Sequence, residues 1–216
     1  MLAVVVLAAG AGSRMGGLAK CLITVDGETM LQRLLHAVRA LAPMPTVLVL
    51  GHPAEAIQRT LRETPVPLPL TWVHNPDPGD NPASSLRLGL SALMPEVDTV
   101  MVLLADQPLL GASELRRAWQ VFQARSFAQR IGWPVHGAEL GHPVLLQTDL
   151  AHEWLAQNPA GLRPWALQKP QQVAIWTPGN PHHTRDLDTP EDLARLTHDT
   201  GQHWALPQTG AKTPPT

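Results

Sequence analysis

Hydrophobic residues along the chain follow two alternating patterns. Continuous apolar runs are typical of strands buried on both faces, and they occupy residues 2–7, 46–50 and 99–104, with weaker runs at 70–73 and 173–176. Apolar residues at helical spacing predict helices, and these are expected at 30–41, 54–61, 84–93, 113–122 and 190–196. This alternation of strands and helices predicts an α/β fold with a mostly parallel sheet between layers of helices.

The alternation stops in two places, and these indicate the domain organisation. Residues 123–172 contain scattered Trp, Pro and Gly with poor periodicity, so we interpret them as an irregular insertion within the domain. From residue 199 the chain is polar and contains Pro and Gly, which predicts a disordered tail at 199–216. The folded domain is therefore expected to cover residues 1–198.

Composition and charge exclude several classes of protein. The 16 Lys and Arg residues against 18 Asp and Glu give a formal net charge of −2, without the basic excess typical of nucleic-acid-binding proteins. No apolar run approaches the ~20 residues of a membrane span, and the start at Met1 lacks the basic residues of a secretory signal. Cys21 is the only cysteine, which fits a reducing compartment. We therefore expect a cytoplasmic globular protein that binds neither nucleic acid nor membrane.

A glycine-rich segment with two cations follows the first predicted strand. Ligands of open parallel sheets bind beyond the carboxyl ends of the strands. Small residues such as Gly10 and Gly12 allow backbone amides to approach phosphate oxygens, and Arg14 and Lys20 can neutralise the phosphates. Met15 stands where a dinucleotide-binding loop has its third glycine, and the Gly-Lys-Ser/Thr of a P-loop is missing. The pattern favours a polyphosphate site over a flexible turn with solvated cations.

Three aspartates are candidates for a metal site. Asp106 follows the strand at 99–104, where a carboxylate can hold Mg²⁺, although alone it is equally explained as a turn or helix cap. Asp186 and Asp188 are two residues apart, so in an extended segment both side chains point to one side. Asp188 could instead help to start the helix at 190–196.

Other polar residues allow two interpretations each. Ser84 and Ser85, at the start of a predicted helix, can hydrogen-bond a nucleobase or cap the helix, and capping is expected for at least one of them. The ten histidines include no pair at the His-x-x-x-His spacing of many zinc sites, so we expect them to be solvated.

Five segments, taken in order, resemble the signature of the MobA-like nucleotidyltransferase family, and within it most closely the molybdenum cofactor cytidylyltransferases (MocA-like). They are Leu7-Ala8-Ala9-Gly10-x-Gly12-x-Arg14-Met15-Gly16-x-x-x-Lys20, Ser84-Ser85-Leu86-Arg87-x-Gly89-Leu90, Ala105-Asp106-Gln107-Pro108, Gly141-His142-Pro143-Val144-Leu145 and Asp186-x-Asp188-Thr189-Pro190-Glu191-Asp192-Leu193. The resemblance runs from about residue 2 to 196. It implies a Rossmann-like three-layer nucleotidyltransferase fold with a mostly parallel sheet.

The resemblance also implies a reaction and its participants. The terminal phosphate of molybdopterin cofactor would attack the α-phosphorus of CTP, giving the cytosine dinucleotide form of the cofactor and pyrophosphate. Such dinucleotide cofactors serve enzymes of the xanthine dehydrogenase type, so an apo-oxidoreductase of that type is an expected partner.

The same resemblance assigns roles to residues of this chain. Catalysis would rest on Arg14, Lys20 and Asp106. CTP would be held by Leu7, Ala8, Ala9, Gly10, Gly12, Ser13, Arg14, Lys20, Ser84 and Ser85. Mg²⁺, with Mn²⁺ as the alternative, would be held by Asp106 with Asp186 or Asp188. The acceptor side would include Gly141, His142 and Pro143, with the 123–172 insertion setting acceptor specificity.

Two loops bear on the choice of substrate. Ala8-Ala9-Gly10 resembles the cytidylyltransferases, whereas guanylyl relatives carry two glycines there, so CTP is favoured over GTP. Asn81-Pro82-Ala83 stands where the family usually has Gly-Met, so the resemblance does not determine which base this loop binds. The alternatives are a related transferase that uses GTP or a sugar, alditol or methylerythritol phosphate acceptor, and a non-catalytic molybdenum cofactor chaperone.

Overall fold

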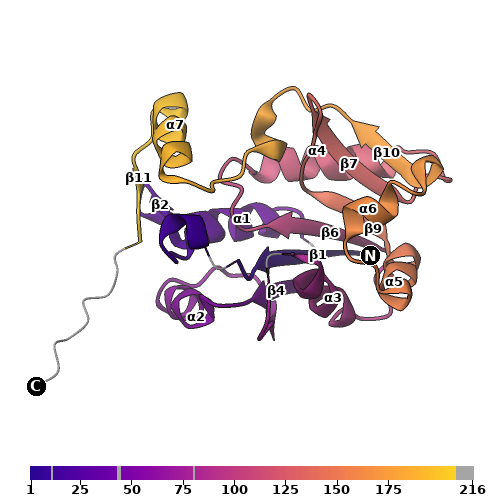
Figure 1. The fold of residues 1–216 in the computed structure, drawn as a ribbon, viewed down its shortest axis with the longest axis horizontal. Coiled ribbons are helices and arrows are strands. Elements are labelled where there is room, and N and C mark those ends of the chain that lie inside the picture. Colours follow the sequence, from indigo (N-terminus) through magenta and orange to yellow (C-terminus); the bar gives the residue numbers. More distant parts are fainter. Residues whose placement is uncertain (11, 43–44, 80, 208–216) are drawn as a thin grey trace, which may run out of the picture.

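The computed structural model describes residues 1–10, 12–42, 45–79 and 81–207 (Figure 1). Its centre is an eight-stranded sheet, formed by β1 (Leu2–Ala8), β4 (Thr46–Leu50), β5 (Leu70–His74), β6 (Thr99–Leu104), β7 (Ile131–His136), β8 (Glu139–Leu140), β9 (Val144–Gln147) and β10 (Val173–Trp176). Seven of these strands follow the order β10-β7-β9-β6-β1-β4-β5, and β8 pairs with β7 off this path.

Most strand pairs of this sheet are parallel. β1 lies between β6 and β4 and is parallel to both, β5 is parallel to β4, and β10 is parallel to β7. β9 is antiparallel to both of its neighbours, β6 and β7. The predicted α/β fold with a mostly parallel sheet is therefore confirmed.

Helices cover both faces of the sheet and explain the continuous apolar strands. They are α1 (Met30–Arg39), α2 (Ala54–Glu63), α3 (Ala83–Ser91), α4 (Ala112–Gln123), α5 (Thr148–Gln157), α6 (Leu162–Ala166) and α7 (Pro190–Thr200). Alternate residues of β1 belong to two different cores: Val4 and Val6 pack with α1, α2 and α4, whereas Val5 packs with α3, α5 and α6. A strand buried on both faces needs no polar positions, which is why its sequence lacks alternation.

Residues 123–172 are not an irregular insertion, and this prediction was wrong. The segment contributes β7 and β9 to the main sheet and the helices α5 and α6 to one of its faces. Its pattern is weak because the strands are short and β7 contains Gly132 and Pro134. Its buried tryptophans, Trp133, Trp154 and Trp165, are part of the core.

A small second sheet joins residues 24–29 to the strand that follows α7. It consists of β2 (Thr24–Val25), β3 (Glu28–Thr29) and β11 (Trp204–Ala205), in the order β11-β2-β3, and Figure 1 shows α7 and β11 beside β2. Trp204 pairs with Val25 and is only 6% exposed. Residues 199–207 are therefore ordered, contrary to the predicted tail, because burial of the Trp204 ring fixes them. The remaining part of that prediction, 208–216, lies outside the described residues.

The predicted helices at 30–41, 54–61, 84–93, 113–122 and 190–196 correspond to α1, α2, α3, α4 and α7. Within the described ranges, the structure has no helix that is long and apolar enough to cross a membrane.

Candidate functional site

The site lies at the carboxyl ends of β1 and β6, which are neighbours in the sheet. Leu7 is opposite Leu104 in the parallel register, and the Ala105 amide donates to the Leu7 carbonyl at 3.0 Å. Asp106 therefore emerges beside the glycine-rich loop that follows β1. The topology brings together two segments that are about 100 residues apart in the sequence.

The loop after β1 turns sharply at Gly12. Gly12 has a positive φ of 60°, and a Cβ there would lie 2.0 Å from the carbonyl oxygen of Leu18, so only glycine fits. Its carbonyl accepts hydrogen bonds from the amides of Met15 and Gly17, at 2.8 and 3.0 Å. The Met15 side chain is buried in a third core with α7 and the small sheet. This loop is thus folded on itself and anchored to the C-terminal part of the chain.

Lys20 joins two carboxylates at the centre of the site. Its ammonium donates to Asp188 Oδ1 at 2.6 Å and to Asp106 Oδ2 at 3.2 Å, and its side chain is only 14% exposed. Burial acts against the charged ammonium, but the two carboxylates outweigh it and raise the pKa of Lys20 above its ordinary value. The site therefore holds a permanent cation between two anions.

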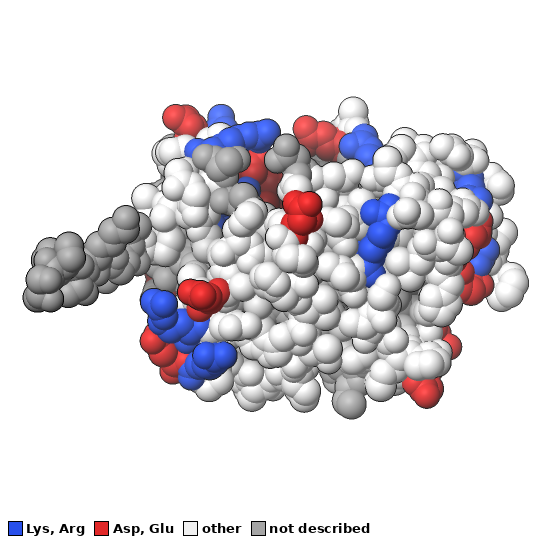
Figure 2. Space-filling view, turned by 60° about the horizontal axis from the view of Figure 1, so that its bottom comes forward, with Lys and Arg blue, Asp and Glu red and all other residues white. Residues whose placement is uncertain are grey.

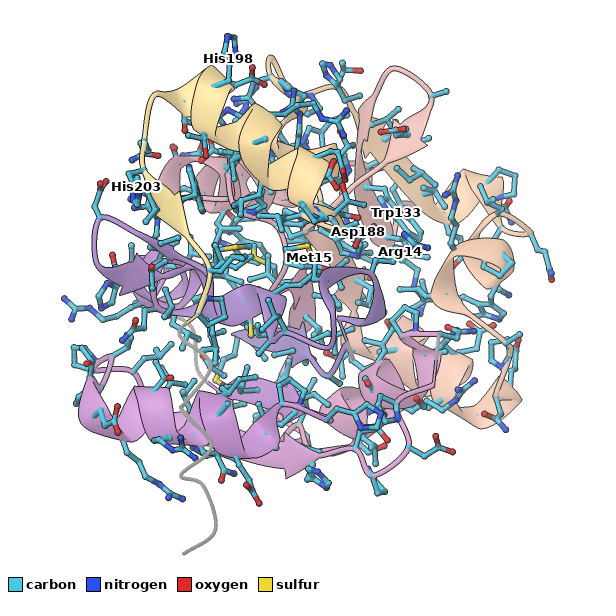
Figure 3. All side chains as sticks on the ribbon, turned by 60° about the vertical axis from the view of Figure 1, so that its left-hand side comes forward. Arg14, Met15, Trp133, Asp188, His198 and His203 are labelled. Atoms are coloured by element: carbon cyan, nitrogen blue, oxygen red, sulfur yellow. The ribbon has the colours of Figure 1, made fainter. Side chains whose placement is uncertain are left out.

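Arg14 approaches the same carboxylate from the surface. Its Nη1 lies 3.2 Å from Asp188 Oδ2, and its side chain is 74% exposed. In Figure 3, Arg14, Asp188 and Met15 lie close together, whereas His198 and His203 are at the periphery. Asp188 thus receives both cations of the loop, and Arg14 can move without disturbing the core.

Asp186 has a different environment from Asp188. Gln107 Nε2 donates to Asp186 Oδ1 at 2.8 Å and also to the His183 carbonyl. Although Asp186 is exposed as a residue, the protein around its carboxyl group and the nearby Asp106 carboxylate raise its pKa to about 6. Asp188, not Asp186, is therefore the partner that shares Lys20 with Asp106.

The three candidate aspartates, Asp106, Asp186 and Asp188, do not form one three-carboxylate cluster. Among the described residues, no group of three or more His, Cys, Asp or Glu side chains could hold a metal ion. Asp106 and Asp188, which are linked through Lys20, are the two carboxylates that fit a divalent cation. Mg²⁺ typically uses one or two carboxylates together with phosphate oxygens and water, so this pair suits a metal that arrives with a nucleotide.

A cavity of about 260 Å³ lies between the glycine-rich loop and the loop before α3. It is lined by Leu7, Ala9, Gly10, Pro78, Gly79, Asn81, Pro82, Ser85, Leu104 and Asp106. A smaller adjoining cavity is lined in part by Ala8 and Lys20. Predicted site residues from the glycine-rich segment, together with Ser85 and Asp106, therefore line two adjoining cavities. The Ser13 side chain lies outside the described part of the structure.

Neither Ser84 nor Ser85 caps the helix, contrary to the prediction. α3 begins after Pro82, and the side chain of Asn81 accepts from the Ala83 amide at 2.9 Å in place of a serine cap. Both serine hydroxyls instead accept hydrogen bonds from Asn75 Nδ2, at 3.0 and 2.9 Å. Only Ser85 lines the cavity. Sequence reasoning missed Asn75, which lies nine residues before the serine pair.

The Gly141-His142-Pro143 segment is tied to His183. A Cβ on Gly141 would lie 2.1 Å from the His183 carbonyl oxygen, which accepts from the His142 amide at 2.8 Å. His183 Nδ1 donates in return to the His142 carbonyl at 2.7 Å. The His183 side chain is thus buried and hydrogen-bonded, not solvated as expected. Burial lowers the pKa of His142 to about 4, so its imidazole is neutral at pH 7.

His142 also lines a second, mainly apolar cavity of about 350 Å³. Trp133, Leu140, Leu162 and Arg163 are among the other lining residues, whereas Pro143 is buried outside it. This cavity shares Leu7, Asn81, Pro82 and Leu104 with the nucleotide-side cavity, so the two adjoin. Sequence reasoning missed Trp133 and Arg163, because both lie in the stretch with poor periodicity.

Charges of both signs are mixed on the surface, whereas they are concentrated at the site. On the face shown in Figure 2, Lys and Arg side chains alternate with Asp and Glu in small groups. The ion pairs at the site, by contrast, bring the cations Arg14 and Lys20 of the loop together with the carboxylates of Asp106, after β6, and Asp188.

Known proteins share the fold of this chain and part of its sequence. The sequence profile of the MobA-like NTP transferase domain matches residues 4–173. The crystal structure of Rv0371c from Mycobacterium tuberculosis H37Rv is 25% identical with a TM-score of 0.75, covering 92% of this chain and 98% of that chain, and Rv0371c has also been solved in complex with manganese. The nucleotidyl transferase Mth528 from Methanothermobacter thermautotroptrophicus shares the fold, with a TM-score of 0.72 at 23% identity over 92% of this chain and 97% of that chain.

Curated relatives are considerably longer than this chain. The bifunctional protein GlmU of Mycobacterium marinum is 41% identical over 131 residues, which are 58% of this chain and 26% of GlmU. This chain thus spans about a quarter of the length of the curated relatives it matches.

Proposed function

Because this chain belongs to the MobA-like NTP transferase domain family, we propose that it is a nucleotidyltransferase that moves CMP from CTP to the terminal phosphate of molybdopterin cofactor and releases pyrophosphate. The observation that carries the proposal is the position of Lys20, which joins Asp106 and Asp188 beside the cavity of the glycine-rich loop. A buried cation and two carboxylates suit a metal-bound triphosphate.

Charge neutralisation is the main task of these residues. The loop amides from Gly10 to Gly16, with Lys20 and Arg14, would hold the phosphates of CTP. Asp106 and Asp188 would hold Mg²⁺, which when bound neutralises phosphate charge. Arg14 and Lys20 would then exchange Asp188 for phosphate oxygens. Both cations already lie beside that carboxylate, so the exchange needs only side-chain movement.

The reaction itself needs no protein nucleophile. An oxygen of the acceptor phosphate attacks the α-phosphorus, and the bond from that phosphorus to the oxygen it shares with the β-phosphorus breaks. The leaving pyrophosphate carries the electron pair, and its developing charge would be stabilised by Lys20 and Arg14. Positioning of two substrates in adjoining cavities supplies the rest of the catalysis.

The second cavity supports an acceptor with a ring system. Its lining is mainly apolar and includes Trp133, Leu140 and Leu162, a lining that suits a flat heterocycle better than a sugar rich in hydroxyl groups. Arg163 lines the same cavity, and in the described ranges it forms no ion pair. We propose that it meets an anionic group of the acceptor.

A second candidate is cytidylyl transfer to a phosphorylated sugar alcohol. It is favoured by the likeness to the 4-diphosphocytidyl-2C-methyl-D-erythritol synthase of Anaerococcus prevotii, with a TM-score of 0.73 over 93% of this chain and 96% of that chain. At 14% identity, this likeness concerns the fold alone.

Pyrophosphate release tests the proposal. The purified protein is incubated with Mg²⁺ and molybdenum cofactor, and CTP, GTP, ATP and UTP are compared. Release with CTP alone is the expected result, and release with GTP alone would overturn the assignment of the base. Replacing the cofactor by methylerythritol phosphate tests the second candidate. Release with none of the nucleotides would favour a non-catalytic cofactor chaperone.

Paired variants connect this activity to the site. Asp106→Asn keeps the shape of the side chain but removes its charge, so Mg²⁺-dependent release should fall at least about 100-fold. Glu96→Gln removes an exposed carboxylate away from the site and should leave release unchanged. Equal activity of the two variants would contradict the role of Asp106.

A further inference from the structure

Asn75 occupies a fixed position at the end of β5. Its side chain is buried, and the residue is only 3% exposed. Its backbone N–H donates to the Leu50 carbonyl at 2.8 Å. This hydrogen bond continues the β4–β5 pairing by one residue. The side chain therefore projects from the rigid sheet toward the start of α3, not from a free loop.

The hydrogen bonds determine which way the Asn75 amide faces. Its Oδ1 accepts from the backbone amide of Asp77 at 3.1 Å, and a backbone N–H can only donate. Its Nδ2 must therefore face the other way, toward Ser84 Oγ at 3.0 Å and Ser85 Oγ at 2.9 Å. An amide nitrogen has only hydrogens to offer, so both hydroxyl oxygens act as acceptors toward Asn75.

Each serine then has one hydroxyl proton left to donate. Ser84 uses its proton within the protein, because its Oγ donates to the Pro78 carbonyl at 3.2 Å. Ser85 is 3% exposed and lines the same cavity as Gly10 and Asp106. Within the described part of the chain, its Oγ has Asn75 as its only hydrogen-bond partner, and its proton has no acceptor. A ligand in the cavity would supply one.

We propose that Asn75 is a positioning residue that makes Ser85 a hydrogen-bond donor to a carbonyl oxygen of the pyrimidine base. The assignment rests on the proposed function for the identity of the nucleotide. Cytosine presents a carbonyl oxygen that can only accept, and a donor held by a buried amide matches it. Asn75 Nδ2 occupies one acceptor position of the Ser85 hydroxyl and leaves its proton available for the base.

Calorimetric binding of CTP with Mg²⁺ to the full chain tests the proposal, with inorganic triphosphate and Mg²⁺ as a probe that lacks the base. Ser85→Ala removes the donor without adding charge, and CTP binding should weaken about tenfold. Asn75→Asp puts an acceptor toward both hydroxyls and turns the Ser85 proton away from the cavity, so it should weaken CTP binding at least as much. Triphosphate binding should be unchanged in Ser85→Ala.

Combining the two substitutions separates positioning from other effects. In a Ser85→Ala background, Asn75→Asp should cause no further loss of CTP affinity beyond any loss of triphosphate affinity. Ser91→Ala, on the exposed side of the same helix, is the matched control and should bind CTP normally. If Ser85→Ala weakened CTP and triphosphate equally, or weakened neither, the role of Ser85 would be overturned. If the wild-type protein failed to bind CTP, the proposed function would fall, and this assignment with it.

Discussion

The ammonium of Lys20 lies 2.6 Å from a carboxylate oxygen of Asp188, although 168 residues separate the two in the sequence. Asp106 accepts from the same ammonium at 3.2 Å, so one cation neutralises two like charges. A divalent metal would neutralise the same pair. We infer that Lys20 occupies the place between the carboxylates until a metal and a triphosphate bind together.

Replacing Lys20 by methionine should expose this exchange. Without the cation, Asp106 and Asp188 repel each other, so the Tm of Lys20→Met in metal-free buffer should fall below that of the wild type. Mg²⁺ should then raise the Tm of the variant more than it raises that of the wild type. Thermal denaturation with and without Mg²⁺ measures both effects.

The control for this variant is Lys169→Met, which breaks the ion pair with Glu153 instead. Its Tm should respond to Mg²⁺ as the wild type does. Pyrophosphate release by Lys20→Met should fall at least about 100-fold, because the charge of the leaving group loses a partner. If Mg²⁺ did not change the Tm of Lys20→Met, the two carboxylates would bind no metal.

Met15 should matter for nucleotide binding and not only for stability. Met15 and Met30 are 5% and 3% exposed in the same core, so Met15→Ala and Met30→Ala should each lower the free energy of unfolding by about 2–5 kcal/mol. Only Met15 belongs to the glycine-rich loop, so only Met15→Ala should raise the KM for CTP. Urea denaturation and steady-state kinetics measure the two effects, and equal KM values would refute the anchoring role.

Arg163 should affect the acceptor and not CTP. Its position on the second cavity predicts that Arg163→Ala raises the KM for the acceptor about tenfold, through loss of one charged contact, while the Kd for CTP stays the same. Arg116→Ala removes an exposed arginine of α4 and serves as the comparison. If Arg163→Ala changed only the affinity for CTP, Arg163 would belong to the CTP site and not to the acceptor site.

The burial of His142 predicts a contribution to acid sensitivity. Burial lowers its pKa from 6.5 to about 4, so between these pH values the unfolded chain binds a proton that the folded chain does not. Stability is therefore lost as the pH falls from 6.5 towards 4. His142→Gln should reduce the fall in Tm between pH 7.5 and 4.5, whereas His203→Gln, at an exposed position, should not. Identical slopes for both variants would contradict the assignment.

The parts of the fold that could be predicted are those determined by local pattern. β1, β4 and β6 are buried on both faces, so their sequences are continuously apolar. Because Asp106 closely follows β6, its position at the carboxyl ends of the strands could also be predicted. β9 and β11 could not be predicted. Each is short and is stabilised by partners distant in the sequence, namely β6 for β9 and β2 for β11.

The same limit applies to the site. The spacing of Asp186 and Asp188 made both possible metal ligands, but Gln107 hydrogen-bonds the first, and Lys20 pairs with the second. Neither contact has a signal in the sequence. Asn75 was missed for a similar reason, because its importance depends on the direction of a side-chain amide. Composition and spacing cannot encode that direction.

The place of Asp188 in the chain has a consequence for the order in which the protein matures. A ribosome releases the N-terminal part first, so the glycine-rich loop, Lys20 and Asp106 emerge while residue 188 has yet to be added. Asp188, α7 and β11 also lie beyond residues 4–173, the part that the family profile matches. The loop gains its second carboxylate and the α7 and β11 contacts of Met15 only when this later segment arrives. The ion-pair cluster around Lys20 is thus completed only after the segment that contains Asp188 has been added.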